Sequence, residues 1–133
     1  MSQSDAVLFA NEAFYRAFAD RRFDTMKTLW AKGAPVSCIH PGWGALAGRD
    51  QVLSSWEAIL GNPDAPDIAC VNPVAQVYGE AAAVICNERI GESFLIATNV
   101  FVREEGRWLL VHRQAGPVVT PPETVADEPP TVH

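Results

Sequence analysis

The chain has 133 residues, of which 48% are hydrophobic and 20% charged, and its formal net charge is −6. This length suits one domain that buries a core of its own, and the composition is typical of a folded globular protein. An acidic chain without a basic stripe excludes a nucleic-acid binder, because lysine and arginine are needed to neutralise phosphates. No stretch of the sequence reaches the roughly 20 apolar residues of a membrane span, so we also expect no membrane partner.

The start of the chain and its cysteines bear on where the protein resides. Residues Met1–Asp5 are polar and acidic, unlike a secretory signal. The three cysteines, Cys38, Cys70 and Cys86, are widely spaced and form no CxxC pair. We therefore expect reduced thiols in a cytoplasmic protein, with no metal site and no cofactor.

Three amphipathic helices are predicted in the first half of the chain. The first has apolar residues at three- and four-residue steps, including Phe14, and Ser4 is the predicted N-cap. The second begins at Asp24 and places Trp30 in the core. The third runs from about residue 49 to residue 60.

Strands are predicted mainly in the second half. A β-rich run over residues 36–40 follows the second helix, and a loop over residues 41–44 follows that run. Pro73 predicts a bulge or a sheet edge. Helices followed by an antiparallel meander indicate an α+β fold, with the helices on one face of a curved sheet. The four meander strands are expected over residues 68–78, 81–90, 93–103 and 107–115.

The turn residues predict how the meander strands pair. Gly79-Glu80 and Gly91-Glu92 each suit a two-residue hairpin loop, and the second of them places Val84 opposite Asn99. The register of the last hairpin stays open at this point. A three-residue loop would place His112 beside Thr98, and a two-residue loop would place Arg113 there. A slip of one residue exchanges the two faces of a strand, so either side chain can point toward the helices.

Two histidines are the candidate catalytic residues. His40 ends a predicted strand before a Gly/Trp loop, where an imidazole can serve as a general base or can cap the loop. His112 lies in an apolar strand and is either a second catalytic group or a core histidine. Two histidines without a third ligand nearby do not predict a metal site.

Other polar and aromatic residues are candidate ligand contacts, each with a structural alternative in the core. A buried Asn99 needs partners, and Trp43 stands in a glycine loop that can close over an aromatic molecule. Glu88 and Arg89 alternate on one strand and are expected on a solvated or interface face. The four candidate ligand-binding residues are Tyr15, Trp43, Trp56 and Asn99.

Over about residues 5–119 the sequence resembles the SnoaL-like branch of the NTF2-like superfamily. It is also similar to the association domain of calcium/calmodulin-dependent kinase II, whose last strand has a similar Gly-basic-Trp pattern. The resemblance implies a cone, in which a strongly curved sheet wraps around three helices, and a homodimer formed through the outer sheet face. The segments that carry the resemblance are residues 38–43, 46–50, 99–103 and 106–112.

Comparison with ketosteroid isomerase, within this superfamily, makes the site expectations sharper. It implies that His40 occupies the position of the catalytic base and that Tyr15 lies near the position of the oxyanion tyrosine. The second oxyanion position, an acid in that enzyme, falls at Thr98 or Asn99. Neither residue is acidic, so steroid isomerisation is not expected.

The predicted function is that of a stand-alone domain, residues 1–119, with a hydrophobic pocket for a small hydrophobic or aromatic molecule. Two alternatives remain open. One is a cofactor-independent isomerase, cyclase, dehydratase or hydrolase with His40 as base, and the other is a non-catalytic association domain. Residues 120–133 form a separate Pro-rich acidic tail, which we expect to pack near basic residues such as Arg21, Arg22 or Arg103.

Overall fold

The computed structural model describes residues 1–120 and residue 122, which fold as three helices and six strands. This arrangement confirms the predicted α+β class. The helices are α1 (Gln3–Ala19), α2 (Phe23–Thr28) and α3 (Arg49–Gly61). The strands are β1 (Ser37–Ile39), β2 (Leu46–Ala47), β3 (Ala69–Tyr78), β4 (Ala81–Ile90), β5 (Ser93–Glu104) and β6 (Arg107–Pro117).

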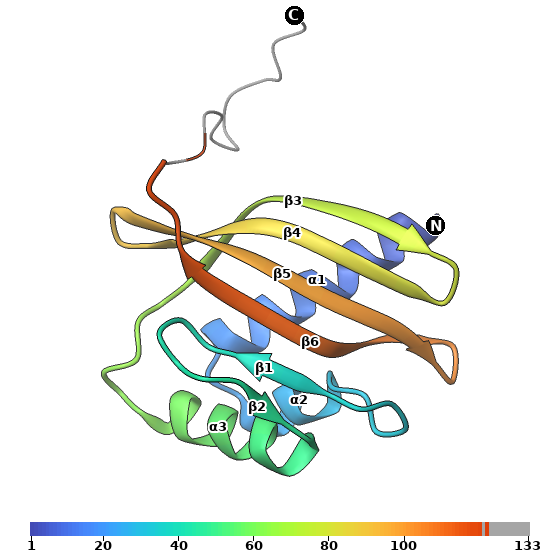
Figure 1. Cartoon of the computed structure of the whole chain (residues 1–133), viewed down its shortest axis with the longest axis horizontal. Coiled ribbons are helices and arrows are strands. Elements are labelled where there is room, and N and C mark those ends of the chain that lie inside the picture. The colour runs from blue at the N-terminus through green and yellow to red at the C-terminus, as the bar shows by residue number, and fades with distance from the viewer. Residues whose placement is uncertain (121, 123–133) are drawn as a thin grey trace, which may run out of the picture.

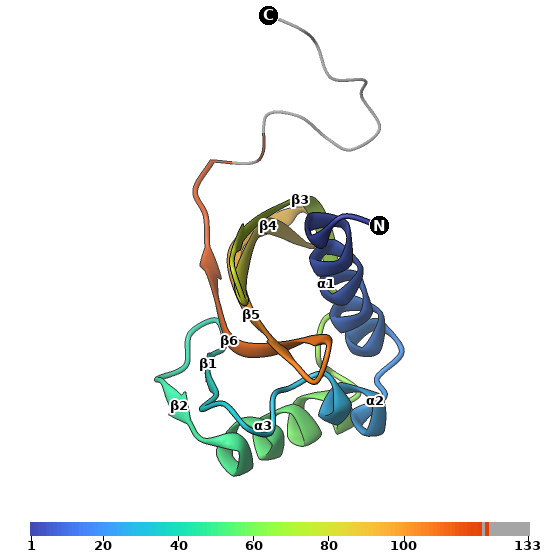
Figure 2. The same cartoon turned by 90° about the vertical axis from the view of Figure 1, so that its right-hand side faces the viewer.

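One sheet contains all six strands, in the order β2-β1-β6-β5-β4-β3 (Figure 1). The β1–β6 pair is parallel and the other neighbours are antiparallel. Figure 2 shows the sheet bending around the helices, with α1 on its concave side and α2 and α3 below it. The predicted cone is therefore present, and its interior is the place where a site can form.

The first helix begins two residues earlier than the sequence predicted. Ser2, not Ser4, is the N-cap: its hydroxyl accepts a hydrogen bond from the Asp5 N–H at 3.1 Å, and the Asp5 carboxylate accepts one from the Ser2 N–H. This reciprocal arrangement satisfies two backbone donors at the helix start, which a cap at Ser4 would not do. The second helix is also shorter than predicted. It ends at Thr28, and Trp30 lies beyond it in a parallel bridge to Leu110.

The β4–β5 pair follows the predicted register, and the β3–β4 pair is joined by the predicted two-residue loop. Val84 lies opposite Asn99, and Gly79 and Gly91 both adopt positive φ angles, of 65° and 59°, in their two-residue loops. The ladder of β3 is interrupted between Val71 and Val74, around Pro73. The predicted bulge is confirmed, since proline cannot donate to the ladder.

Neither predicted register of the last hairpin is correct along its whole length. The loop has two residues, so Phe101 pairs with Leu110, but a bulge then shifts the pairing by one residue. Beyond the bulge Thr98 lies opposite Gln114, and Asn99 lies opposite Arg113. A bulge inserts one extra residue into one strand, which a register deduced from the turn alone cannot include. As a result Arg113 points into the cone and is buried.

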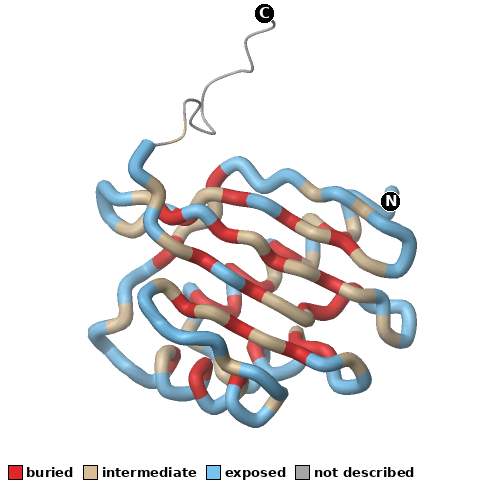
Figure 3. Tube along the Cα trace, viewed as in Figure 1, coloured by how far each residue is buried: buried red, intermediate tan, exposed pale blue. Residues whose placement is uncertain are grey.

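The core lies between the concave face of the sheet and the three helices, and buried and exposed residues alternate along the strands (Figure 3). Its largest fully buried side chains include Trp30, Trp56 and Phe14. Polar side chains are buried beside them, which is unusual unless they have partners. The buried polar residues are Asn11, His40, Ser55, Glu88, Asn99 and Arg113.

No helix among the described residues is long and apolar enough to cross a membrane. Residue 121 and residues 123–133 lie outside the part of the chain that the structure describes, and the predicted packing of the acidic tail falls there.

Candidate functional site

A cavity of about 310 Å³ opens where α1, α3 and the loop after α3 approach the end of the sheet. The loop is held by Arg21, whose guanidinium donates to the carbonyl oxygens of Asn62 and Ala65 and lies 3.5 Å from the Asp67 carboxylate. Six residues from five different elements and loops define the cavity chemically: Phe18, His40, Trp43, Ile59, Ile68 and Arg113.

His40 contributes the imidazole ring of this cavity. Its Nε2 lies 2.8 Å from the Ser55 hydroxyl oxygen, and that hydroxyl donates its single hydrogen to the Val52 carbonyl at 2.6 Å. Ser55 must therefore accept from His40, which assigns the proton of the neutral ring to Nε2. Nδ1 then carries a lone pair, and the nearest partner recorded for it among the described residues is the Cys38 sulfur at 3.8 Å.

The surroundings of His40 keep its ring neutral. Burial lowers its pKa to about 4, and the positive charge of Arg113 contributes in the same direction. Burial also raises the pKa of the neighbouring Cys38 to about 12, so this residue remains a thiol. Two tryptophans fix the orientation of the His40 ring. The ring centres of Trp43 and Trp56 each lie 4.8 Å from the centre of the imidazole, in edge-on geometry.

Arg113 is the second polar group of the cavity, and it is paired from behind with Glu88. The guanidinium donates two hydrogen bonds to the carboxylate, and both side chains are almost completely buried. The guanidinium also lies 5.2 Å from the Phe14 ring centre and 5.9 Å from that of Trp56. Burial by itself would lower the pKa of Arg113, but the hydrogen bonds and charge of Glu88 outweigh burial and raise it.

One donor of Arg113 is unused. Its Nε–H is buried and has no hydrogen-bond partner among the described residues. A buried donor without an acceptor costs about 1–3 kcal/mol, so such groups are uncommon in folded proteins. Two residues that line the cavity thus carry a donor, on Arg113, and an acceptor, on His40, and the charge of the arginine is balanced by Glu88.

Tyr15 and Asn99 lie deeper in the cone, beside the same ion pair. The Tyr15 hydroxyl donates to the Glu88 carboxylate at 2.5 Å and accepts from the Asn99 amide at 3.1 Å. The Asn99 amide also donates to Asn11 at 2.9 Å. Burial, followed by the charge of Glu88, raises the pKa of Tyr15, so its hydroxyl stays protonated and can donate.

The predicted site residues thus separate into three places. His40 and Trp43 line the cavity, and Trp56 packs behind the His40 ring with no exposed surface. Tyr15 and Asn99 belong to the buried network around Glu88 rather than to the cavity lining. The third place holds only His112, which precedes Arg113 on β6 and points away from the cone. Its Nδ1 lies 2.6 Å from the Ser37 hydroxyl oxygen.

Glu88 is the residue that the sequence analysis missed. The expectation that it lies on a solvated or interface face is wrong, because its side chain is fully buried against Arg113. The alternation of residues along β4 could have predicted its burial, because Val84, Cys86 and Glu88 share one face of the strand. Among the described residues no group of three histidine, cysteine or acidic side chains is arranged to hold a metal ion.

Comparison with known proteins places this geometry in a family. Residues 7–120 match the model of the SnoaL-like domain. A solved structure from Streptomyces avermitilis, a proposed dehydratase of the NTF2-like family, is 33% identical, with a TM-score of 0.79 over 88% of this chain and 96% of that one. A proposed calcium/calmodulin-dependent protein kinase type II association domain from Thiobacillus denitrificans is 30% identical, with a TM-score of 0.72 over 82% of this chain and 92% of that one.

One curated relative is the F-box protein SKIP8 of Arabidopsis thaliana, which is 28% identical over 113 residues. The alignment covers 83% of this chain and 48% of that protein, so the chain spans about half the length of the curated relative it matches. The family match, by contrast, covers nearly the whole described part of the chain. The chain belongs to the SnoaL-like domain family of the NTF2-like superfamily.

Proposed function

We propose that the cavity beside His40 and Arg113 binds a compact, uncharged and largely aromatic molecule that carries a hydroxyl group. The observation that supports this most strongly is a pair of groups: the lone pair of His40 Nδ1, which has the Cys38 sulfur at 3.8 Å as a weak partner, and the unpartnered Nε–H of Arg113. A ligand hydroxyl can donate its hydrogen to His40 Nδ1 and, at the same time, accept a hydrogen bond from the Arg113 Nε–H.

Charge and size narrow the ligand class further. His40 is neutral, Glu88 balances Arg113, and Asp64 also lines the cavity, so the cavity offers no uncompensated positive charge to hold an anion. Desolvating an anion without a compensating charge is costly, which favours an uncharged ligand. A volume of about 310 Å³ is at the small end for ligand sites, and the apolar surfaces of Phe18, Ile59 and Ile68 suit a single aromatic ring.

Phenol and benzyl alcohol are suitable probes, with toluene and benzoate as matched controls. Trp43 is half exposed at the cavity and reports occupancy through its fluorescence. We expect phenol and benzyl alcohol to quench it saturably, toluene to bind at least tenfold more weakly, and benzoate not to bind. Equal binding of toluene and phenol would contradict the role of the two polar groups, and no binding of any probe would contradict a ligand cavity.

A second candidate function is acid–base elimination in the same cavity, and it is favoured by two observations. The unprotonated His40 Nδ1 can accept a proton from carbon, while the Arg113 Nε–H can donate a hydrogen bond to developing negative charge. The similar structure from Streptomyces avermitilis is a proposed dehydratase. Loss of water from a β-hydroxy ketone needs these two actions, and the proton that His40 takes from carbon then passes to the departing hydroxyl, which leaves as water.

A cyclic β-hydroxy ketone tests this candidate, because elimination gives a conjugated enone with a new ultraviolet absorbance. The catalysed rate should rise with pH through the pKa of His40, about 4, and then stay level. His40→Gln should abolish the catalysed rate without unfolding the chain. A wild-type rate equal to that of buffer, or an unchanged rate in His40→Gln, would reject the candidate and leave the binding function standing.

We further propose that the chain forms a homodimer through the outer face of the sheet. Val74, Ile85 and Ile96 point outward from neighbouring strands and are 60%, 49% and 41% exposed. They surround a hollow of about 240 Å³, and Val74 lies directly opposite Ile85 in the ladder. Gln76 and Asn87 also line this hollow, and an exposed apolar cluster with polar neighbours on a sheet suits contact with the same face of a second copy.

A further inference from the structure

A pair of cysteines lies apart from the cavity, and one of them lines a third and wider hollow of the molecule. Cys70 is on β3 and Cys86 is on the neighbouring strand β4. Both side chains contact α1 on the concave face; Cys70 pairs with Glu88 in the ladder, and Cys86 lies opposite the β3 bulge around Pro73. The pair lies on the side of α1 opposite α3, so it does not belong to the His40 cavity.

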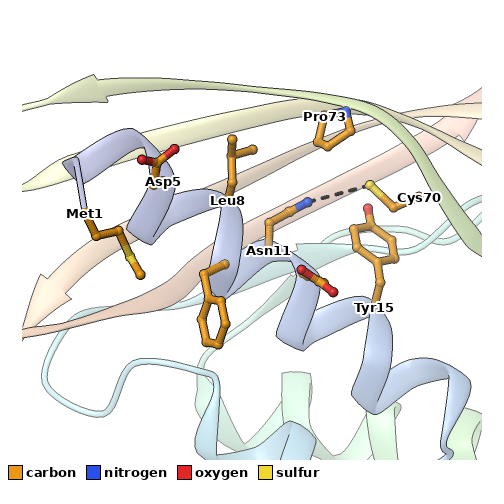
Figure 4. A pocket seen from close by; sticks show the side chains of 9 residues that line it. Met1, Asp5, Leu8, Asn11, Tyr15, Cys70 and Pro73 are labelled. Carbon is orange, nitrogen blue, oxygen red and sulfur yellow. Dashed lines mark hydrogen bonds between the residues drawn. The ribbon is translucent and has the colours of Figure 1, made fainter. Parts of the chain in front are cut away.

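Two residues of α1 hold the two sulfurs. The Asn11 amide donates to the Cys70 sulfur at 3.7 Å, and the Tyr15 hydroxyl lies 3.2 Å from the Cys86 sulfur. Asn11 and Tyr15 are four residues apart on one helix face, which places their side chains roughly 5–6 Å apart at Cβ. The thiols they contact are therefore neighbours, and Figure 4 shows Cys70 directed at Asn11 beside Tyr15.

The two thiols also interact with each other, and unequally. Contact with Cys86 raises the pKa of Cys70, while a hydrogen bond from Cys70 lowers the pKa of Cys86. One sulfur of such a pair holds the proton and the other gains thiolate character. Cys86 is the sulfur that gains it, so Cys86 can accept the Cys70 proton, and the exposed Cys70 sulfur then becomes the nucleophilic thiolate.

Only one of the two sulfurs is open to small molecules. Cys70 is half-buried and lines an open groove of about 600 Å³ between α1 and β3, together with Leu8 and Phe9. Cys86 is 2% exposed beneath it. Cys38, the remaining cysteine, is fully buried and lies far from this pair in the sheet order, on β1. An oxidant that enters the groove therefore meets Cys70 first and finds Cys86 directly behind it.

We propose that Cys70 and Cys86 form a redox site, in which a hydroperoxide converts the two thiols into a cross-strand disulfide. The Cys70 sulfur passes its proton by way of Cys86 to the departing hydroxyl and attacks the O–O bond of hydrogen peroxide, giving a sulfenic acid and one molecule of water. The Cys86 sulfur then attacks the Cys70 sulfur, loses its proton and expels the hydroxyl group as a second water. Two thiols are oxidised by two electrons and one hydrogen peroxide is reduced to two waters, so the step balances.

The reaction can be followed on the full chain. The reduced protein is treated with equimolar hydrogen peroxide, the free thiols are alkylated, and the product is digested with trypsin and a Glu-specific protease. Trypsin alone leaves both cysteines in the peptide 50–89, but cleavage after Glu80 separates them. We expect an intact mass lower by two hydrogens, a linked pair of peptides, and reversal by dithiothreitol.

Three variants and one unfolded sample serve as controls. Cys38→Ser should form the linkage as the wild type does, whereas Cys70→Ser and Cys86→Ser should each lose it completely. The same treatment in urea should spread oxidation over all three cysteines. The proposal is wrong if a linkage to Cys38 dominates, if the cysteines are overoxidised without a linkage, if the thiols do not react, or if the unfolded chain forms the Cys70–Cys86 linkage as selectively as the folded one.

Discussion

Glu88 and Arg113 form a doubly hydrogen-bonded ion pair that crosses the cone from β4 to β6, above the intervening strand β5. The pair connects two parts of the molecule. On one side Glu88 accepts from Tyr15, and on the other Arg113 lines the cavity beside His40. The ion pair thus sets the electrostatic character of the cavity, because it supplies a donor without supplying a net charge.

Removal of one partner of this pair should be costly. Glu88→Gln leaves a buried guanidinium with no opposite charge, and we expect the free energy of unfolding to fall by about 3–5 kcal/mol. Chemical denaturation measures this loss. The double variant Glu88→Met/Arg113→Met leaves no unpaired charge. Its free energy of unfolding should therefore fall by less than the sum of the decreases in Arg113→Met and Glu88→Gln.

The exposed ion pair between Arg16 and Glu12 provides a matched control, since the same atom types meet there at 2.9 Å on the surface. Glu12→Gln should leave the free energy of unfolding unchanged within experimental error. A Glu88→Gln variant as stable as Glu12→Gln would show that the buried pair contributes nothing to the fold.

The network around Glu88 also shows what could be predicted from sequence. The strand bounds, the turns and the register of the first hairpins follow from local signals, such as the Gly91-Glu92 pair and the alternation of apolar residues. The bulge opposite Val100 has no such signal. It decides that Arg113 rather than His112 enters the cone, so the cavity could not be assembled from sequence alone.

His40 was predicted as a candidate catalytic residue because it ends a strand before a glycine loop. Which of its two ring nitrogens carries the proton could not be predicted. That placement depends on Ser55, fifteen residues away on α3, and on the Val52 carbonyl that takes the serine hydrogen. Such contacts arise from packing between elements, which has no periodic signature in the sequence. The same holds for the neighbouring positions of Cys70 and Cys86, which were expected only to be reduced.

The stability of the chain should depend on pH through His40. Its pKa is about 4 in the folded chain and near 6.5 when unfolded, so the unfolded chain binds more protons between these values. Stability is then full above pH 6.5 and falls as the pH drops toward 4, by about 3 kcal/mol at most. His40→Gln should lack this part of the decline. Parallel pH curves for the two proteins would contradict a neutral, buried His40.

Ser55 should act as a positioning residue for His40. Ser55→Ala removes the acceptor of the Nε2–H, so the ring loses the bond that fixes its protonation. We expect phenol to bind about tenfold more weakly, and the free energy of unfolding to fall by about 1–3 kcal/mol. Ser54→Ala is the matched control, because Ser54 is the exposed neighbour on the same helix. Equal phenol affinities in the two variants would argue against this role.

The proposed dimer should dissociate when charge enters the outer sheet face. Ile85→Lys places an ammonium in the middle of the apolar patch, opposite Val74. Sedimentation equilibrium should then report a monomer at concentrations where the wild type is a dimer. Phe9→Lys, on the exposed side of α1, should leave the dimer intact. A wild type that is monomeric, or an Ile85→Lys variant that remains dimeric, would exclude this interface.

The state of the His40 imidazole is measured most directly by proton–nitrogen correlation spectra of its ring at pH 7, with and without phenol. Before addition, the spectrum should show a neutral ring with its proton on Nε2 and an unprotonated Nδ1. On addition, the Nδ1 resonance should move as it accepts the phenol hydroxyl, while Nε2 keeps its proton. A ring protonated on Nδ1, or an Nδ1 resonance that saturating phenol leaves unchanged, would contradict the proposed binding site.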